Sequence, residues 1–431
     1  MSSFKRAGLL VLFLFSALQI HLYAQLNQSV DFYRFVYYSP SPRINAMGMA
    51  GASLPTDDPY GFYYNPAQLG YFSQTNNLSY QLYPSSAKWE GQDVLNFRNS
   101  AINLGYNFKN LLGGINLSAG FGYIHSKLDY GTYTSEFYSD TSSTPIGTVK
   151  FNPYDEYDAY SIGVGINYNV QFSIGVTYKN ILSEILYLYP YGTDELNAKG
   201  YSIDYGMLLT VPIVKLIEPK YKFDIMENIP AVPYLNFSIG YSRLNQGARP
   251  SFNVEPFVSL PLPRDTRLGY ALSVGLNIKL NDKPFKLFEY DFTADAEEIM
   301  INAYQVNVHS NFPYTYYTYK DGLGDIGIGN ILGLKGDDNV TIHKAHVFNL
   351  LESFTAMIGR FDGGEFRNEE SNGIGMRLKG LLNLFKAYTG SETFNFIADH
   401  FDVQYYSSTI NIENMKTKFE SVNLSFYNFE F

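Results

Sequence analysis

The sequence predicts an all-β fold, a transmembrane antiparallel β-barrel of about 14 strands with an N-terminal plug in its lumen. The main observation is an alternation of apolar residues with Gly, Ser and Asn, at a period of two, along most of the chain. The alternating segments run for about 9 to 14 residues, which suits a tilted strand that crosses a bilayer. A compact apolar segment, too irregular to be a strand, precedes the first of them.

Each strand candidate has one fully apolar face. In residues 102–108, Asn and Gly alternate with the apolar residues Ile102, Leu104, Tyr106 and Phe108. The same pattern returns in residues 115–123, 162–168, 172–178, 235–241 and 268–278. Because successive side chains point to opposite faces of a strand, we expect Ile239 to face lipid and Ser238 to face the lumen.

A soluble β-sandwich also alternates, but two features favour the membrane barrel. The strand candidates are longer than the usual globular strand of about 5 or 6 residues. Their polar face carries small residues rather than the charged residues of a solvated sheet. In lipid such a sheet must close on itself, because an open edge would leave unpaired amides in hydrocarbon.

The strand candidates begin near residues 75, 100, 115, 157, 171, 199, 231, 267, 285, 301, 345, 371, 395 and 419. An even number of strands is typical of bacterial single-chain barrels. Residues 212–230 and 309–344 fit no strand. The chain ends in "SVNLSFYNFEF", which resembles the aromatic last strand that barrel-assembly machinery reads, so we expect that machinery as a partner.

Residues 130–156 form a long segment rich in Tyr, Ser and Thr, whereas the turns at 109–114, 169–170 and 281–284 are short. Outer-membrane barrels have short periplasmic turns and long extracellular loops. We therefore expect residues 130–156 outside the cell, where rigid aromatic side chains suit a protein partner. The candidate partner-facing residues are Tyr130, Tyr133, Phe137, Tyr138 and Tyr154.

Residues 1–24 have the pattern of a secretory signal peptide. Lys5 and Arg6 precede an apolar run, residues 7–20, that is too short to cross a bilayer as a helix. Cleavage after Ala24 would leave Gln25 as the first mature residue. We expect Sec export and integration into the bacterial outer membrane, with its lipid as the surrounding solvent.

Composition excludes several classes of function. The formal net charge of −10 argues against a nucleic-acid partner, which would require clustered Lys and Arg. The absence of cysteine excludes disulfides, thiolate metal sites and cysteine nucleophiles. The 39 Tyr and 33 Phe residues indicate extensive amphipathic surface, as at a membrane interface.

The irregular segment "INAMGMAGASLPTDDPYGFYYNPAQLGYF", residues 44–72, combines many glycines and prolines with large apolar side chains. It is too apolar for a disordered linker. A barrel of about 14 strands encloses a lumen that its own side chains cannot fill. We therefore expect residues 25–73 to form a plug and residues 74–431 to form the barrel.

The same segment resembles a known family. Gly48 to Gly51, Asp57-Asp58 and Asn65-Pro66-Ala67 resemble the N-terminal segment of FadL-like outer-membrane barrels, and most closely the PorV/PorQ-like branch. "PLPRDTRLGYALSVG", residues 261–275, and the hairpin around "FTAMIGRFDGG" are similar to that branch as well. The resemblance implies a hatch formed by Met47, Gly48, Gly51, Asp57, Asp58, Asn65, Pro66 and Ala67.

The resemblance implies two classes of function. PorV-like proteins support type IX secretion or surface attachment by binding secretion components or cargo proteins. We favour this hypothesis for the present chain. The alternative is a FadL-like channel for uptake of hydrophobic small molecules. A closed apolar pocket beside the plug would favour uptake, whereas an open polar lumen would favour protein partners.

Catalytic and metal-binding motifs are weak. "GLGDIG", residues 322–327, lacks the strand and helix context of a nucleotide-binding loop. His343 and His346 have no carboxylate at a supporting spacing, and no G-x-S-x-G elbow is present. We expect no enzymatic activity, no cofactor and no metal.

Overall fold

The computed structural model describes residues 33–88, 95–138, 145–189, 192–218, 222–226, 229–252, 261–280, 283–306, 314–364, 366–389, 392–412 and 415–429. The expected signal peptide, residues 25–32 and residues 430–431 lie outside these ranges.

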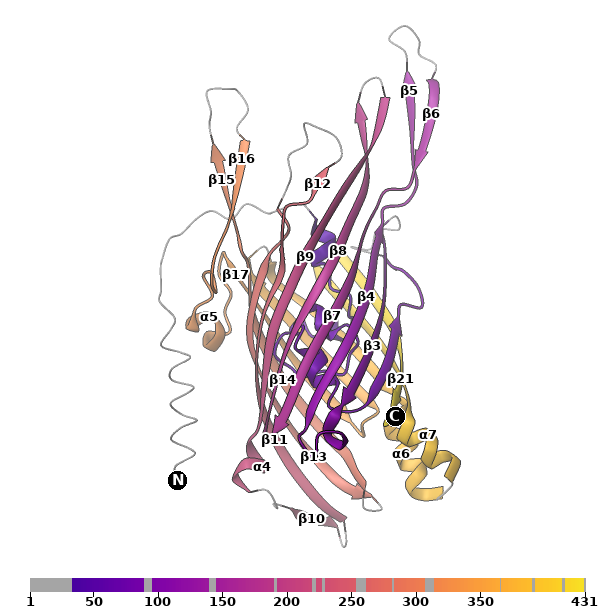
Figure 1. The fold of residues 1–431 in the computed structure, drawn as a ribbon, viewed down its shortest axis with the longest axis vertical. Helices are drawn as coiled ribbons and strands as arrows, with labels where there is room; N and C mark the ends of the chain where they lie inside the picture. The colour runs from indigo at the N-terminus through magenta and orange to yellow at the C-terminus, as the bar shows by residue number, and fades with distance from the viewer. Residues whose placement is uncertain are drawn as a thin grey trace.

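Fourteen antiparallel strands of the described chain form a closed barrel, which confirms the expected fold class (Figure 1). Each strand pairs with the next one along the chain, and β1 pairs with β21 to close the sheet, from Asn77 opposite Tyr427 to Leu82 opposite Val422. The barrel strands are β1 (Asn77–Leu82), β3 (Asn96–Asn107), β4 (Leu117–Asp129), β7 (Tyr154–Tyr168), β8 (Val170–Tyr189), β9 (Gly192–Pro212), β11 (Ile229–Gly247), β13 (Asp265–Leu280), β14 (Lys283–Ile299), β17 (Val340–Leu350), β18 (Phe354–Gly363), β19 (Phe366–Arg377), β20 (Phe401–Ile412) and β21 (Met415–Tyr427).

Shorter elements decorate both ends of the barrel. β2 (Ala87–Lys88), β10 (Phe223–Met226) and β12 (Ser251–Phe252) extend the main sheet, while β5 (Tyr133–Tyr138) with β6 (Pro145–Phe151) and β15 (Ile301–Val306) with β16 (Tyr314–Tyr319) form separate hairpins. The helices are η1 (Arg34–Tyr37), α2 (Pro42–Ala46), η2 (Gly61–Tyr63), α3 (Gln68–Phe72), η4 (Phe108–Asn110), α4 (Ile213–Ile217), α5 (Ile328–Gly333), α6 (Leu378–Thr389) and α7 (Glu392–His400). Within the ranges described above, none of these helices has the length and apolar character needed to cross a bilayer.

The two faces of the wall carry the side chains that the alternation predicts. Ile162 is 59% exposed on the outer face, whereas its neighbour Ser161 is fully buried on the lumenal face. Ser238 is buried and exchanges a hydrogen bond with Thr210, while Ile239 points to the other face. The apolar residues therefore face lipid, and the small polar residues face the interior.

Three expected strands are wrong in detail. The segment from residue 301 belongs to the β15–β16 hairpin, outside the main sheet. The segment from 345 is part of two strands, β17 and β18, because the chain turns at Leu351 and Glu352, which adopt positive φ without a glycine to mark the turn. The segment from 395 begins in α7, whose sequence "TFNFI" alternates like a strand, and β20 begins only at Phe401.

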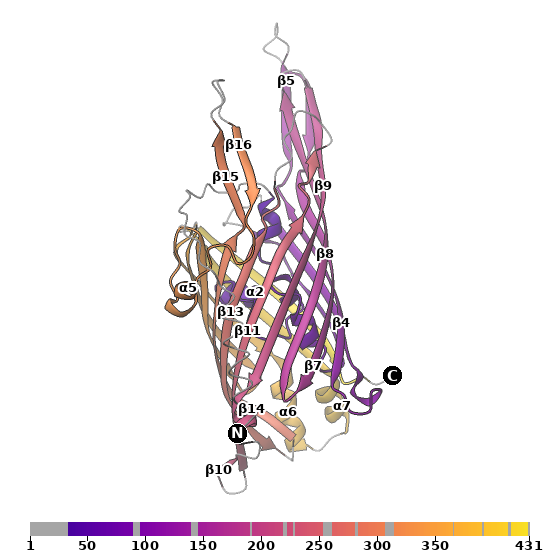
Figure 2. The ribbon, with the colours of Figure 1, turned by 60° about the vertical axis from the view of Figure 1, so that its left-hand side comes forward.

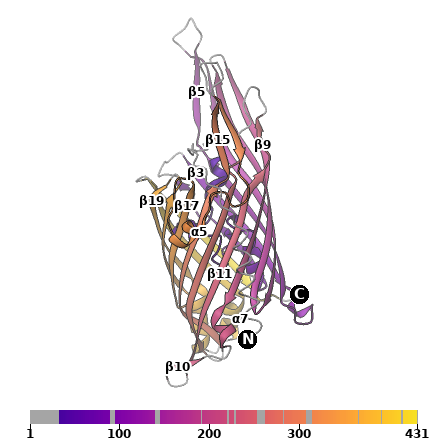
Figure 3. The same ribbon diagram turned by 90° about the vertical axis from the view of Figure 1, so that its left-hand side faces the viewer.

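The two ends of the barrel differ in the length of their connections. The β7–β8 turn is a single residue, Asn169 at φ 61°, while the β5–β6 and β15–β16 hairpins rise from the opposite end (Figures 1 and 3). We call the short-turn end the periplasmic end and the hairpin end the surface end, after the usual orientation of outer-membrane barrels. Residues 212–230, unassigned from sequence, include α4 and β10 at the periplasmic end, and residues 309–344 include β16 and α5 at the surface end.

The outer face of β7 offers a test of membrane depth. Outward-facing Tyr160 and Tyr168 bracket Ile162, Val164 and Ile166, as aromatic girdles bracket the apolar band of a barrel. Val164→Arg, near the middle of this band, is expected to cost about 2–4 kcal/mol of unfolding free energy, and Tyr168→Arg about 0–1 kcal/mol. Reversible unfolding from lipid vesicles measures both. Equal costs at the two positions would contradict the assigned membrane depth.

Candidate functional site

Residues 33–73, here called the lumenal segment, lie inside the barrel (Figures 1 and 2). Its backbone bonds to strands on all sides: the Gly48 amide donates to Ser371 of β19 at 2.8 Å, and the Ala52 amide donates to Asp295 of β14 at 2.7 Å. On the facing wall, Asn103 of β3 donates to the Pro59 carbonyl at 3.1 Å. Only a segment that occupies the lumen can reach strands so far apart around the sheet.

Glycines on the inner wall make room for this segment. A Cβ atom at Gly175 would lie 2.2 Å from the Pro66 carbonyl oxygen, and one at Gly240 would lie 2.0 Å from the Ala52 carbonyl oxygen. Comparable contacts below 3.0 Å recur at Gly105, Gly120, Gly122, Gly163, Gly165, Gly206, Gly359 and Gly373. The glycine-rich face of the strands therefore allows direct contact between two backbones.

The first part of the hatch pattern is a helix followed by a tight turn. Ser41 caps α2 by accepting from the Ile44 amide at 3.0 Å, and Pro42 occupies the first turn. Gly48 follows at φ 61°, and its missing side chain leaves space for the backbone of Arg360. Met47 is buried in a small apolar cluster with Leu54, and a Cβ atom at Gly51 would meet the Tyr64 ring.

The Asn65-Pro66-Ala67 turn is anchored by one buried amide side chain. Asn65 Nδ2 donates to the carbonyls of Ala52 at 2.8 Å and Met207 at 3.0 Å, and Oδ1 accepts from the Ala67 amide at 3.0 Å. All these groups belong either to the lumenal segment or to β9. Asn65 therefore stabilises the conformation of the turn and attaches the turn to β9 of the wall.

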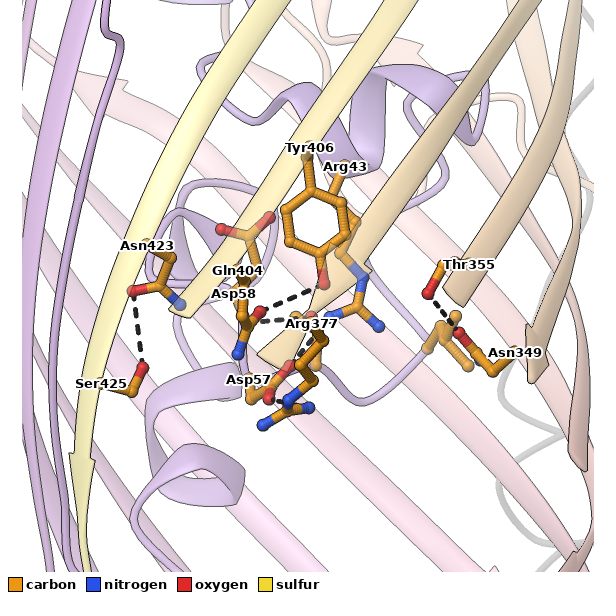
Figure 4. A network of polar contacts seen from close by, with 12 residues as sticks. Arg43, Asp57, Asp58, Asn349, Thr355, Arg377, Gln404, Tyr406, Asn423 and Ser425 are labelled. Atoms are coloured by element: carbon orange, nitrogen blue, oxygen red, sulfur yellow. Dashed lines mark hydrogen bonds and ion pairs between the residues drawn. The ribbon is translucent and has the colours of Figure 1, made fainter. Parts of the chain in front are cut away.

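The adjacent carboxylates Asp57 and Asp58 make different contacts (Figure 4). Asp57 pairs with Arg43 at 2.8 Å and with Arg377 of β19 at 2.9 Å. Burial acts to raise the pKa of Asp57, but the guanidinium groups of Arg377 and Arg43 hold it below its ordinary value. Asp57 is therefore an ionised link between the lumenal segment and the wall.

Asp58 instead serves the local fold. It accepts hydrogen bonds from the Ser41 hydroxyl and from the Tyr60 amide, the latter at 2.9 Å. Its side chain is buried, and burial raises the pKa of this carboxyl group. Asp58 thus ties α2 to the start of η2 within the segment.

A second group of buried charges was not anticipated from the sequence. Arg267 of β13 pairs with Glu297 of β14 at 2.8 Å and donates to the Met49 carbonyl at 3.1 Å. His343 of β17 lies between Glu297 and the Gly48 carbonyl, at 2.5 and 2.7 Å. The sequence does place charged residues at lumen-facing positions of the alternating strands. It does not show which of them pair, because the partners lie on different strands.

The surface-facing half of the lumen contains a large buried apolar cluster, here called the aromatic chamber. The barrel contributes inward side chains that include Phe97, Leu128, Tyr157, Ile181, Phe361, Ile410 and Phe419. The lumenal segment contributes Tyr33, Phe35, Val36, Tyr60, Phe62, Tyr63 and Tyr64. The dense aromatic run at 60–64 therefore fills the lumen from inside.

Three of the five loop residues expected to face a partner have described side chains, and these three have different surroundings. Tyr133 is 46% exposed and stacks on Phe151 with ring centroids 5.4 Å apart. Tyr130 instead donates to Asp155, and Tyr154 lies under the Lys127 ammonium, 3.5 Å from its ring centroid. Phe137 and Tyr138 lie on β5, and their side chains are outside the described residues.

No family model matches the chain, and no curated protein matches it in sequence. Among solved structures, it is similar to the toluene transporter TbuX of Ralstonia pickettii, with 10% identity over 91% of this chain and 98% of that one, at a TM-score of 0.37. It is also similar to the monoaromatic hydrocarbon channel CymD, with 10% identity over 90% and 97%, at 0.39. A FadL homologue of Pseudomonas aeruginosa overlaps with 10% identity over 89% and 96%, at 0.32. Scores this low carry no inference about function.

Within the described chain, no group of three or more His, Asp or Glu side chains has an arrangement that could hold a metal ion. His343 and His346, considered together from the sequence, lie on opposite faces of β17, because His343 is buried in the lumen and His346 is exposed.

The link at Asp57 predicts a pH-dependent stability. Asp57→Asn is expected to lower the free energy of unfolding by about 1–3 kcal/mol at neutral pH, because it removes the carboxylate partner of the Arg43 guanidinium. Since the folded state lowers the pKa of Asp57, its contribution is complete above the ordinary value of 3.8 and is lost as the pH falls below it.

Urea unfolding in detergent micelles, at neutral pH and below the ordinary aspartate pKa, measures this effect. The difference between the wild type and Asp57→Asn should shrink at the lower pH. Asp224→Asn, at an exposed carboxylate of β10, is the matched control. A difference that is independent of pH would contradict the ionised link.

Proposed function

We propose that this outer-membrane barrel takes up hydrophobic small molecules, with the aromatic chamber as their binding site and the lumenal segment as the plug that closes it. The observation that carries the proposal is the apolar character of the side chains that fill the surface-facing half of the lumen. Barrels that conduct water-soluble solutes have polar interiors. A chamber lined by Phe97, Phe361 and Phe419 suits an apolar ligand instead.

Some of the side chains that fill the aromatic chamber belong to η1, which is a short helix. Phe35 and Val36 are buried in the chamber on η1, a single turn of 3-10 helix with no side-chain cap. The Val36 carbonyl accepts from the Tyr63 hydroxyl at 3.1 Å. η1 reaches the wall through the Tyr37 hydroxyl, which donates to Glu297 of β14, whereas the part from α2 to α3 has the larger set of buried polar anchors described above. We therefore propose that η1 moves and exposes the chamber to a ligand.

Charged groups beside the chamber do not make it polar. Lys179 of β8 pairs with Asp204 at 2.8 Å and donates to Asn245 at 2.8 Å, and all three are buried. Arg267 and Glu297 neutralise each other in the same way. A few paired polar groups in an apolar wall are typical of sites that orient a small ligand.

The periplasmic half of the lumen is polar. The apolar side chains of the aromatic chamber are therefore confined to the surface-facing half. Asn349 of β17 donates to Glu289 at 3.1 Å and to Asp291 at 3.2 Å, and Lys286 pairs with Glu289 at 2.7 Å. An apolar molecule would not remain beside these carboxylates. The chamber is therefore proposed as a binding site and not as one end of a continuous apolar tunnel.

Weakening η1 should accelerate uptake. Cells that carry the Phe35→Ala, Val36→Ala double variant are expected to take up an apolar aromatic compound several-fold faster than wild-type cells, because the chamber opens at a lower cost. Radiolabelled uptake measures the rate, and cells without the gene should be the slowest. Phe121→Ala, which removes an outward-facing ring, is the control and should not change uptake. Equal uptake with and without the gene would exclude the proposal.

A second candidate is support of protein secretion or surface attachment, as the PorV/PorQ-like resemblance implies. The observation that favours it is the height of the surface-side hairpins. β8 and β9 pair without interruption from Gln171 opposite Thr210 to Tyr189 opposite Gly192, and β5–β6 rises beside them (Figures 1 and 2). Such ordered projections could contact a partner protein.

Removal of residues 133–151 separates the two functions. If the β5–β6 hairpin binds secretion components or cargo, its loss should leave secreted proteins with a shared carboxyl-terminal domain in the periplasm, while uptake of apolar compounds stays unchanged. Immunoblots of cell fractions measure the first effect. Normal cargo localisation in a strain that has lost the hairpin would exclude a role of this hairpin in secretion.

A further inference from the structure

The α6–α7 helical hairpin connects β19 to β20 at the periplasmic rim (Figures 1 and 2). The rim holds it through several polar contacts. The Lys379 amide donates to Asp402 at 3.0 Å, and Asn428 donates to the Asp399 carbonyl at 2.9 Å. Lys386 of α6 pairs with Asp399 of α7, which joins the two helices. The hairpin is therefore a fixed part of the barrel end.

The hairpin exposes large apolar side chains. The exposed fractions are 41% for Leu378, 57% for Phe385, 41% for Phe394 and 55% for Phe396. Exposure of several such residues on two short helices is unfavourable in water. Exposed apolar side chains gathered on one element in this way often mark an interaction site.

The aromatic residues of α7 continue those of the lipid-facing wall. Phe396 lies 6.1 Å from Phe401, and Phe401 lies 5.2 Å from Phe426, between ring centroids. Phe401 and Phe426 are register partners on β20 and β21, on the outer face that also carries Leu424, 51% exposed. The exposed ring of Phe396 thus joins the membrane-facing surface of the barrel through a row of rings, with the His400 imidazole packed against both Phe396 and Phe426.

We propose that the α6–α7 hairpin lies in the periplasmic leaflet of the outer membrane, with its exposed phenylalanines among phospholipid acyl chains. Continuity with the lipid-facing wall identifies the partner as lipid. A periplasmic protein would have to bind an apolar surface that already borders the bilayer. An interfacial helix of this type buries its apolar side chains about 5–10 Å into the headgroup and acyl boundary.

The lack of cysteine makes a direct test simple, since one introduced cysteine can be labelled alone. Phe385→Cys and Phe396→Cys are labelled with the fluorophore NBD, and the full chain is reconstituted in phosphatidylethanolamine and phosphatidylglycerol vesicles. Both labels should show blue-shifted emission. Lipids brominated near the glycerol should quench them more strongly than lipids brominated deep in the chain. Lys335→Cys, in an exposed loop at the other end of the barrel, is the control and should show neither effect.

Folding of each variant is checked by the heat-dependent mobility of the barrel on a gel. Water-like emission and no quenching at both hairpin positions, in barrels that are folded, would overturn the proposal. The same result accompanied by protection of the labels upon addition of periplasmic extract would overturn it in favour of a protein partner.

Discussion

Irregular backbone persists at the depth of the membrane only where every peptide group finds a partner within the protein, because lipid offers none. The inner wall of this barrel is shaped by that requirement. Ser371, Asp295, Asn103 and Ser242 bond to backbone groups of the lumenal segment. Glycines bring the wall close enough for these bonds. The small polar face of the strands therefore exists to accommodate a segment that has no regular structure of its own.

Charges inside the lumen follow from the same requirement. An unpaired buried charge is far more costly than a paired one, so the ionised groups occur in linked sets. One set joins Arg43, Asp57 and Arg377, and another joins Arg267, Glu297 and His343. The first set joins the segment to β19, while the second lies on the neighbouring strands β13, β14 and β17 and bonds to the Met49 and Gly48 carbonyls of the segment. The charges thus fix the position of the segment, and its aromatic side chains pack against those of the wall.

Local patterns predicted the wall better than the interior. The alternation around Ile239 gave the correct face for each side chain, because a period of two depends only on neighbouring residues. The turn at Leu351 and Glu352 could not be predicted, since no glycine or proline marks it. Phe394 and Phe396 alternate like a strand although they lie on α7. The pairing of His343 with Glu297 depends on the register of β14 with β17, and that register is set by the whole sheet.

The seam of the barrel bears on the order of assembly. β1 follows directly after the lumenal segment and pairs with β21, so Asn77 meets Tyr427 only after the twelve barrel strands between them have been made. Contacts between such distant residues form slowly, because a long loop must close first. The segment is attached to the first strand and bonds to strands all around the wall. We infer that it acts as a template around which the later strands gather, and that the seam closes over a lumen that is already filled.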